Sequence, residues 1–316
     1  MRIRVLTFNV QHDAGDVRRT AWINAEIQRV APDLVALQEV CDPARRDQLA
    51  ELIAGAGLSY TTHQADVIDL PDATDGSVLA TRWPHRVVEI LDHRPTADSD
   101  AHWWTLAAAV EVPGLGELLI ILPTTPWQLD QSAVREDQLL AVADLDARHR
   151  RELPTIIAGD LNATPDSAGI RFLTGMQSLG GRSTAYHDAW DVAGDGPGYT
   201  WITDNPVAAA EIDDLLGQSI HHRRLDYILV GTKHAHPRAS ARIIRADLIG
   251  VGASLSDHYG VLAELELGEV SSDGVVDEGS QVGRAEELEG VGGSEGGQAV
   301  DVRPQGGGSG EGIVGV

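Results

Sequence analysis

Two residue types are nearly missing from this chain of 316 residues, which has one cysteine, Cys41, and one lysine, Lys233. A single cysteine cannot form an internal disulfide, and it cannot supply the thiolate cluster of a structural zinc site. Because Thr232 precedes the lysine, no lysine-containing Walker A phosphate loop is present, and most Schiff-base chemistry is excluded. The sequence therefore excludes disulfide-rich, zinc-structured and P-loop proteins.

Long hydrophobic runs are missing as well. No apolar stretch of the sequence reaches the ~18 residues that a membrane-spanning helix needs. The first residues, Met1–Leu6, enter a strand-like pattern with no basic and apolar leader ahead of them. We therefore expect a cytoplasmic protein without a membrane span.

Positive charge is scarce, since 48 acidic and 24 basic residues give a formal net charge of -24 at pH 7. The first 268 residues alone carry 38 acidic and 22 basic residues. Such a field opposes indiscriminate binding to polyphosphates, because that affinity comes from cationic groups that replace counterions. A local basic groove is still compatible with this composition.

The composition changes after Gly268. Residues 269–316 hold 14 of the 34 glycines, no aromatic residue, and 10 acidic against 2 basic residues. A segment of this kind cannot bury enough apolar surface to offset its chain entropy. We predict one folded domain over residues 1–268 and a disordered, acidic, glycine-rich tail over residues 269–316. An acidic arm that docks on a partner is the alternative for the tail.

Apolar runs rich in Val, Ile and Leu recur through the first 268 residues and predict ten strands. Helices are expected to begin at Asp16, at Asp42 and at Ser132. Because strands outnumber helices and many are adjacent in sequence, the pattern favours an α/β sandwich with mixed sheets over a doubly wound parallel sheet. The predicted strands are Arg2–Phe8, Leu34–Leu37, Ser77–Thr81, Val87–Leu91, Thr105–Val112, Leu118–Leu122, Thr155–Ala158, Leu225–Val230, Ala241–Leu248 and Tyr259–Leu267.

Two of these strands carry a carboxylate on a face that is otherwise apolar. Strand alternation places Glu39 on the same side as Val35 and Leu37. It likewise places Asp226 on the face of the apolar residues two and four positions further on. An anion in such a position is costly without a cation or a hydrogen-bond donor beside it, so each acid is expected to have a partner.

Further polar residues stand at strand ends. Asn9 closes the first strand, Asp160 and Asn162 follow a buried strand, and Asp257 and His258 precede the last one. Each residue alone has an ordinary explanation as a turn residue, a helix cap or a surface acid. Carboxylates, amides and an imidazole at several strand ends together indicate a divalent-cation site that handles phosphate.

The same residues carry a family resemblance. Five segments, in this order, resemble the motifs of the endonuclease/exonuclease/phosphatase superfamily. The resemblance implies a four-layer αββα sandwich of two mixed sheets flanked by helices. It also implies hydrolysis of a phosphoester that depends on Mg²⁺, with Mn²⁺ as an alternative, by in-line attack of water on phosphorus. The segments are Thr7–Val10, Leu37–Val40, Gly159–Asn162, Arg224–Ile228 and Ser256–His258.

The resemblance also implies a metal site. Carried over by motif, Glu39 is the principal ligand, and Asn9 and Asp257 lie near the same ion, directly or through water. Members of the superfamily are assigned one or two ions, and the sequence leaves that number open.

Catalytic roles follow from the resemblance too. Asp160 is expected to orient or deprotonate the attacking water, and Asn162 to hold that water or a phosphate oxygen. His258 is expected to donate to the phosphate, with Asp226 fixing its tautomer. The roles of Asp160 and His258 could be exchanged in part.

The sequence departs from the family in one place. Many members place a histidine on the strand before the long helix, whereas here the corresponding segment, Ile121–Gln128, has none. Thr124 or Thr125 would be a weaker donor, because a neutral hydroxyl donates less strongly than a cation. The alternative to an active enzyme is therefore a catalytically weakened binding module on the same fold, and a structural interaction protein that uses the acidic tail is a third reading.

The expected partner is a phosphoester substrate: a nucleic acid, a nucleotide or a phospholipid head group. A monomer is expected. The segment His221–Arg224 leads directly into the strand that carries Asp226, and it is either a phosphate-binding loop or a solvated one.

Overall fold

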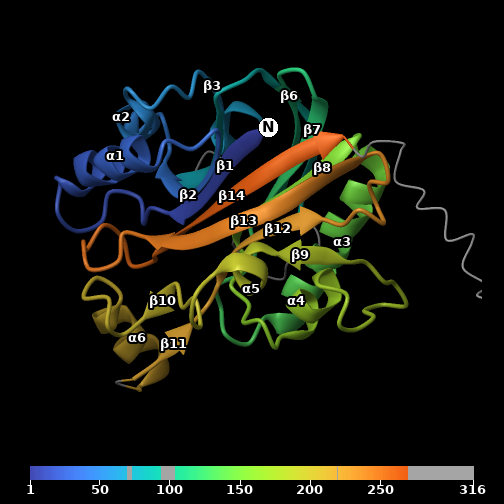
Figure 1. The fold of residues 1–316 in the computed structure, drawn as a ribbon. Helices are drawn as coiled ribbons and strands as arrows, with labels where there is room; N and C mark the ends of the chain where they lie inside the picture. The colour runs from blue at the N-terminus through green and yellow to red at the C-terminus, as the bar shows by residue number, and fades with distance from the viewer. Residues whose placement is uncertain (70–72, 94–103, 219, 270–316) are drawn as a thin grey trace, which may run out of the picture. The chain divides into compact units, whose positions relative to one another are not determined.

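The computed structural model describes residues 1–69, 73–93, 104–218 and 220–269, which form twenty-one elements (Figure 1). From residue 270 onward, the predicted tail lies outside the described residues. The strands are β1 (Arg2–Asn9), β2 (Leu34–Cys41), β3 (Tyr60–His63), β4 (Asp75–Thr81), β5 (His85–Asp92), β6 (Trp104–Val112), β7 (Gly116–Pro123), β8 (Leu153–Asp160), β9 (Tyr186–Asp188), β10 (Trp201–Ile202), β11 (His222–Arg223), β12 (Asp226–Gly231), β13 (Ala239–Ile249) and β14 (Gly260–Glu269). The helices are α1 (Arg19–Val30), α2 (Gln48–Ile53), the 3-10 turn η1 (Gln64–Asp66), α3 (Ser132–His149), α4 (Ala168–Leu173), α5 (Ala189–Ala193) and α6 (Ala209–Leu216).

The strands form two six-stranded sheets and a two-stranded ribbon. The first sheet has the order β13-β14-β1-β2-β4-β3 and the second the order β5-β6-β7-β8-β12-β9. Each is mixed, because β1 and β2 are parallel in the first and β7 and β8 in the second, while their other neighbours are antiparallel. Strands β10 and β11 pair with each other and form the ribbon. The predicted mixed α/β sandwich is confirmed.

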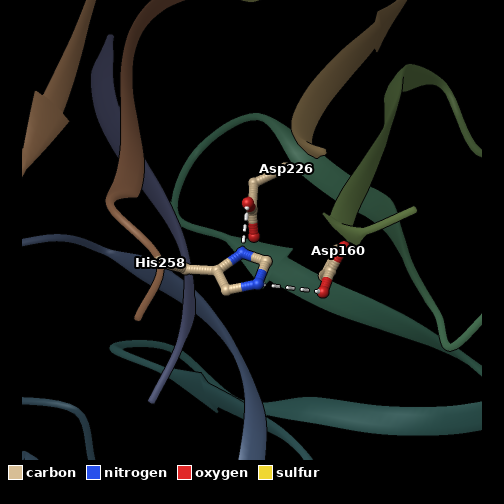
Figure 2. Close-up of side chains that lie close together, drawn as sticks. All are labelled: Asp160, Asp226 and His258. Atoms are coloured by element: carbon tan, nitrogen blue, oxygen red, sulfur yellow. Dashed lines mark hydrogen bonds and ion pairs between the residues drawn. The ribbon is translucent and has the colours of Figure 1, made fainter. Parts of the chain in front are cut away.

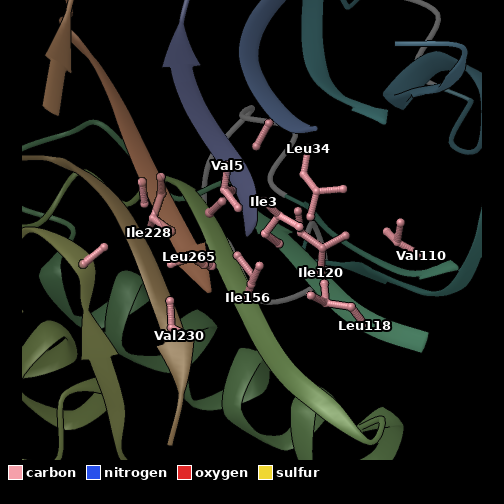
Figure 3. Close-up of a cluster of buried hydrophobic side chains, with 14 of the residues drawn as sticks. Ile3, Val5, Leu34, Val110, Leu118, Ile120, Ile156, Ile228, Val230 and Leu265 are labelled. Carbon is pink, nitrogen blue, oxygen red and sulfur yellow. The ribbon is translucent and has the colours of Figure 1, made fainter. Parts of the chain in front are cut away.

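Three apolar clusters account for the layers. The inner faces of the two sheets contribute fully buried side chains to one cluster, because alternate residues of each strand face the opposite sheet (Figure 3). A second cluster joins α1 and α2 to the outer face of the first sheet, and a third joins α3 and α4 to the outer face of the second. Representative side chains are Val5, Leu34, Ile120, Ile156 and Ile228 between the sheets, Ile23, Ile27 and Leu52 on one outer side, and Leu139, Val142 and Phe172 on the other.

All ten predicted strands are present, but two helix starts were predicted too early. Helix α1 begins at Arg19 and α2 at Gln48. Asp16 accepts a hydrogen bond from the Arg18 amide (2.9 Å) and Asp42 one from the Ala44 amide (2.8 Å), so both acids stabilise turns that precede the helices. The short elements β3, β9, β10, β11 and α4 to α6 were not predicted. No helix in the described residues combines the length and apolarity needed to cross a membrane.

The topology brings the polar strand ends to one edge of the two sheets. Parallel β1 and β2 end there, and antiparallel β14 begins there, preceded by His258. In the second sheet β8 ends where antiparallel β12 begins, so that Asp160 and Asp226 are cross-strand partners. Residues far apart in the sequence therefore meet at this edge.

Candidate active site

An imidazole lies between two carboxylates at this edge. The Nδ1 atom of His258 is 2.8 Å from Oδ2 of Asp226, and its Nε2 atom is 3.9 Å from Oδ2 of Asp160 (Figure 2). All three side chains are buried. Asp226 faces the opposite sheet, as do Ile228 and Val230 on the same strand, so the face predicted for this acid by alternation is confirmed.

The imidazole is held in its charged form. Burial by itself lowers the pKa of His258, but the negative charges of Asp226, Asp160 and Asp257 outweigh burial and raise the pKa well above its usual value of 6.5. A histidine of this kind is an imidazolium at neutral pH, with Nδ1–H donated to Asp226 and Nε2–H directed toward Asp160.

Asn9 connects this group to a further acid, Glu39. Its Nδ2 atom donates to Oε1 of Glu39 (2.8 Å) and to Oδ2 of Asp160 (3.3 Å). Asp257 completes the group: its Oδ1 atom accepts from the His258 amide (3.1 Å), and its Oδ2 atom lies 4.0 Å from the imidazole Nε2. Asn162 is joined to Asp160 through its own backbone amide (2.9 Å). The seven residues singled out in the sequence therefore lie together.

Glu39 reaches the site through an irregularity that the sequence did not reveal. Val35 and Leu37 pack toward α1 and α2, and regular alternation would send Glu39 the same way. Instead the β2–β4 register shifts between Leu37 and Val40, Glu39 has a φ of 55°, and Val40 continues the apolar row. The predicted face of Glu39 is thus wrong, because the bulge inserts a residue into the strand. A positive φ at a non-glycine residue costs free energy and is typical of functional sites.

The carboxylates repel one another. Burial, followed by the charge of Asp257, raises the pKa of Glu39 to about 8, and burial, followed by the charge of Asp226, raises the pKa of Asp160 to about 7. Among the described residues no arginine or lysine forms an ion pair with Glu39, Asp160, Asp226 or Asp257. Among the described residues, the His258 imidazolium is the only cation within 4.0 Å of these acids, and it reaches three of them: Asp160, Asp226 and Asp257. The site therefore has the charge and the oxygen donors to accept a divalent cation.

Two groups of side chains could hold that cation. Oxygen and nitrogen atoms of Asp160, Asp226 and His258 lie within 4.8 Å of one another. However, the imidazole Nδ1 is already bonded to Asp226, which leaves a charged N–H rather than a lone pair facing Asp160. Glu39, Asp257 and the Asn9 carboxamide offer oxygen ligands, which suit a hard ion such as Mg²⁺. We favour this second group.

Two cavities open on either side of the acids. One, of about 450 Å³, is lined by polar groups that include Gln38, Asp75 and Ser77. The other, of about 210 Å³, has a mixed lining: apolar side chains such as Trp201 and Leu215 lie beside His258 and the acids Asp257 and Glu211. Four residues line both cavities, so the cavities are two parts of one cleft. The shared residues are Glu39, Trp127, Asp160 and Asn162.

Thr124 and Thr125 stand where many family members place a histidine. Thr124 is engaged with the Ser77 hydroxyl (3.1 Å), and the Thr125 carbonyl accepts from Asn162 Nδ2 (3.3 Å). The buried Thr125 hydroxyl has no hydrogen-bond partner among the described residues, and Thr125 lines the polar cavity. A neutral donor is therefore available at this position.

Thr200 is a further residue that supports the site. Its buried hydroxyl accepts from the amides of Leu225 (3.0 Å) and Asp226 (3.3 Å), and its carbonyl accepts from the Tyr259 amide (2.8 Å). It thereby ties the start of β12 to the segment that carries His258. No sequence signal identifies such a threonine, because its partners lie more than twenty residues away.

The fold and the site together define a two-sheet α/β sandwich with a buried acid and imidazole group of the phosphoester-hydrolase kind. The chain belongs to the endonuclease/exonuclease/phosphatase family, whose model matches residues 6–258. Members of this family are phosphoester hydrolases. The resemblance read from the motifs is thus confirmed.

Solved structures share the fold. An endonuclease/exonuclease/phosphatase from Beutenbergia cavernae is 24% identical over 84% of this chain and 72% of its own, with a TM-score of 0.61. A D. rerio TDP2 complexed with a single-strand DNA product is 20% identical over 84% and 99% of the two chains, with a TM-score of 0.63. The human Nocturnin catalytic domain with a bound sulfate anion is 19% identical over 84% and 94%, with a TM-score of 0.59. No curated protein matches the sequence.

Proposed function

We propose that this protein hydrolyses a phosphoester by metal-dependent, in-line attack of water on phosphorus. The observation that carries the proposal is the cluster that these groups form. Asn9 donates to Glu39 and Asp160, and the His258 imidazole lies within 4.0 Å of Asp160, Asp226 and Asp257. Glu39, Asp257 and Asn9 would hold Mg²⁺ or Mn²⁺, and the bound ion would supply Lewis-acid stabilisation of the phosphate oxygens.

The remaining side chains provide the proton chemistry. Asp160 orients and deprotonates the attacking water, a role that its raised pKa supports because a base near neutrality transfers protons most efficiently. His258 donates from Nε2 to a phosphate oxygen, and Asp226 holds its tautomer through Nδ1. Asn162 holds the water or a phosphate oxygen.

The substrate class follows from the comparisons only in outline. The DNA product bound by a TDP2 of the same fold favours a nucleic acid or nucleotide, and a phospholipid head group is the further candidate. The cytoplasmic location and the monomeric state stay predictions from the sequence.

The test is hydrolysis of a panel of aryl phosphodiesters, oligonucleotides and phosphoinositides after chelator treatment, measured as released phenol, shortened strands and inorganic phosphate respectively. We expect activity to return with Mg²⁺ or Mn²⁺ and to be lost in Asp160→Asn. Inactivity on the whole panel with either ion would refute the proposal.

The second candidate, a binding module without turnover, is favoured by the missing strand histidine. It predicts measurable ligand binding, no product, and the same binding in wild type and Asp160→Asn.

A further inference from the structure

Two consecutive arginines precede β12 in opposite environments. Arg224 is buried, with Nη1 2.5 Å from Oδ2 of Asp188 and Nη2 2.7 Å from Oδ1 of Asp191. Its guanidinium also lies 4.8 Å from the centre of the Tyr227 ring. Arg224 is therefore committed to holding α5 and β9 against β12.

The Arg223 guanidinium has no such partners among the described residues. It is partly buried and forms no ion pair or side-chain hydrogen bond within the described residues. Asp166 is the acid whose charge most favours it, but that carboxylate accepts instead from the Thr164 hydroxyl (2.5 Å). An arginine keeps its charge in proteins, so a guanidinium with free donors faces the cleft.

The backbone of Arg223 lies in the two-stranded β10–β11 ribbon, which forms a β-bridge with His258. Arg223 in β11 pairs with Trp201 in β10, and Trp201 forms a β-bridge with His258. The Thr200 amide donates to the Arg223 carbonyl (2.9 Å). In Figure 1 this ribbon and α6 lie together at one end of the two sheets. The backbone of Arg223 is thus held in place relative to the site.

The guanidinium borders two cavities. One is the 210 Å³ cavity, which is also lined by His258, Asp160 and Asn162. The other, of about 370 Å³, continues beyond Asn162 and is lined by Arg223, Arg135 and the hydroxyl-bearing residues Ser132, Thr164 and Ser167, with Glu136 as the one acid among the described lining residues.

Charge distinguishes the 370 Å³ cavity from the 450 Å³ cavity. Two of the described residues that line the 370 Å³ cavity are arginines and one is an acid. The 450 Å³ cavity is lined by Glu39, Asp75 and Asp160, and none of its described lining residues is an arginine or a lysine. A second anionic group on a substrate would be repelled there and attracted toward Arg223. Arg135 adds to the attraction, although its Nη1 atom is already bonded to the carbonyls of Pro126 and Gln128.

We propose that Arg223 binds a second phosphate group of the substrate, in the cavity that it shares with Ser132, Thr164 and Asn162. This inference rests on the proposed function, since the first phosphate is the one attacked beside Asp160. The substrate is then a phosphoester that carries a second phosphate, from either a nucleotide or an inositol phosphate. Arg223 acts here as a positioning residue, because it holds a part of the substrate that does not react.

The test compares ligands with one and two phosphates by calorimetry in the presence of Mn²⁺, with each ligand checked for integrity afterwards. The probes are thymidine 5′-monophosphate, thymidine 3′,5′-bisphosphate and inositol 1,4-bisphosphate. We expect wild type to bind at least one bisphosphate about tenfold or more tightly than the monophosphate. Arg223→Gln should remove most of this preference, and Arg223→Lys should keep part of it. The bisphosphate that is preferred identifies the source of the second phosphate.

Arg238→Gln is the matched control, because it removes one positive charge from a side chain that is 85% exposed. It should keep the full preference. No preference in wild type, an equal loss for mono- and bisphosphate in Arg223→Gln, or the same loss in Arg238→Gln would overturn the proposal. Metal-dependent hydrolysis of bis(p-nitrophenyl) phosphate, which has a single phosphate, tests the proposed function separately, so the two failures are distinguishable.

Discussion

Replacing Glu39 by glutamine should stabilise the metal-free protein while it weakens metal binding. Burial and the charge of Asp257 raise the pKa of Glu39 from 4.5 to about 8, so the folded state disfavours the carboxylate. Because the folded pKa lies above the unfolded one, the stabilising contribution of this group is fully present below pH 4.5 and is lost as the pH rises through about 8. Glutamine is neutral at every pH, and its carbonyl oxygen can still accept from Asn9.

The magnitude follows from the two pKa values. At ~1.36 kcal/mol for each pKa unit, full burial would make the carboxylate cost ~5 kcal/mol above pH 8. Glu39 is partly exposed, however, and solvent screens its charge, so we expect about 2 kcal/mol in Glu39→Gln. For a domain of this size that corresponds to a rise of about 4 to 8 °C in Tm.

Thermal unfolding monitored by circular dichroism measures this effect at pH 5 and pH 9, with a chelator and then with excess Mn²⁺. Glu39→Gln should melt higher than wild type at pH 9 in chelator and close to it at pH 5. Mn²⁺ should raise the Tm of wild type, and it should raise the Tm of the variant much less. Glu152→Gln, at a side chain that is 73% exposed, is the control and should change none of these values. A variant that melts lower at pH 9, or that keeps the full metal response, would refute the reasoning.

Three further substitutions separate chemistry from stability. Asp226→Asn should lower kcat by about 10²- to 10⁴-fold with little change in KM, because it removes the carboxylate that holds the His258 tautomer. Steady-state kinetics on an aryl phosphodiester measure this change. An unchanged kcat would contradict the proposed role of Asp226. Arg224→Ala should reduce the free energy of unfolding by about 3–5 kcal/mol, since Asp188 is left buried and unpaired. Urea denaturation measures this loss. A loss under ~1 kcal/mol would show that the Arg224–Asp188 ion pair contributes little to stability. Leu139→Ala removes a fully buried side chain of α3 and should cost about 2–5 kcal/mol in the same assay. A loss under ~1 kcal/mol would contradict the packing described for this helix.

The candidate site was largely predictable because its residues break local patterns. Asn9, Asp160 and Asp226 extend apolar rows that face the opposite sheet, and a polar residue in such a row is visible as soon as the strand is recognised. The motifs then supplied the order and the roles. Glu39 shows the limit of this reasoning, because its direction depends on a bulge that two-residue periodicity cannot indicate.

The supporting residues were not predictable in the same way. Thr200 has no periodic signature, and its role exists only because β12 and the segment before β14 both lie against it. Helices α1 and α2 start later than predicted because aspartates that resemble helix caps stabilise preceding turns instead. Thr200 meets its partners through the tertiary fold, whereas each aspartate bonds to an amide two residues further along the chain.

By itself the sequence determined the mixed α/β class, the positions of ten strands and the identity of the acids, amides and imidazole, since burial periodicity and residue chemistry are local properties. Only the tertiary structure decided which side chains meet, and it separated Arg223 from Arg224. Two neighbouring guanidiniums are alike in sequence, but one is bonded to the buried Asp188 and the exposed Asp191, 36 and 33 residues away, and the other faces an open cleft. The difference arises because electrostatic interactions depend on distance in space, and the sequence pattern of a single strand does not give that distance.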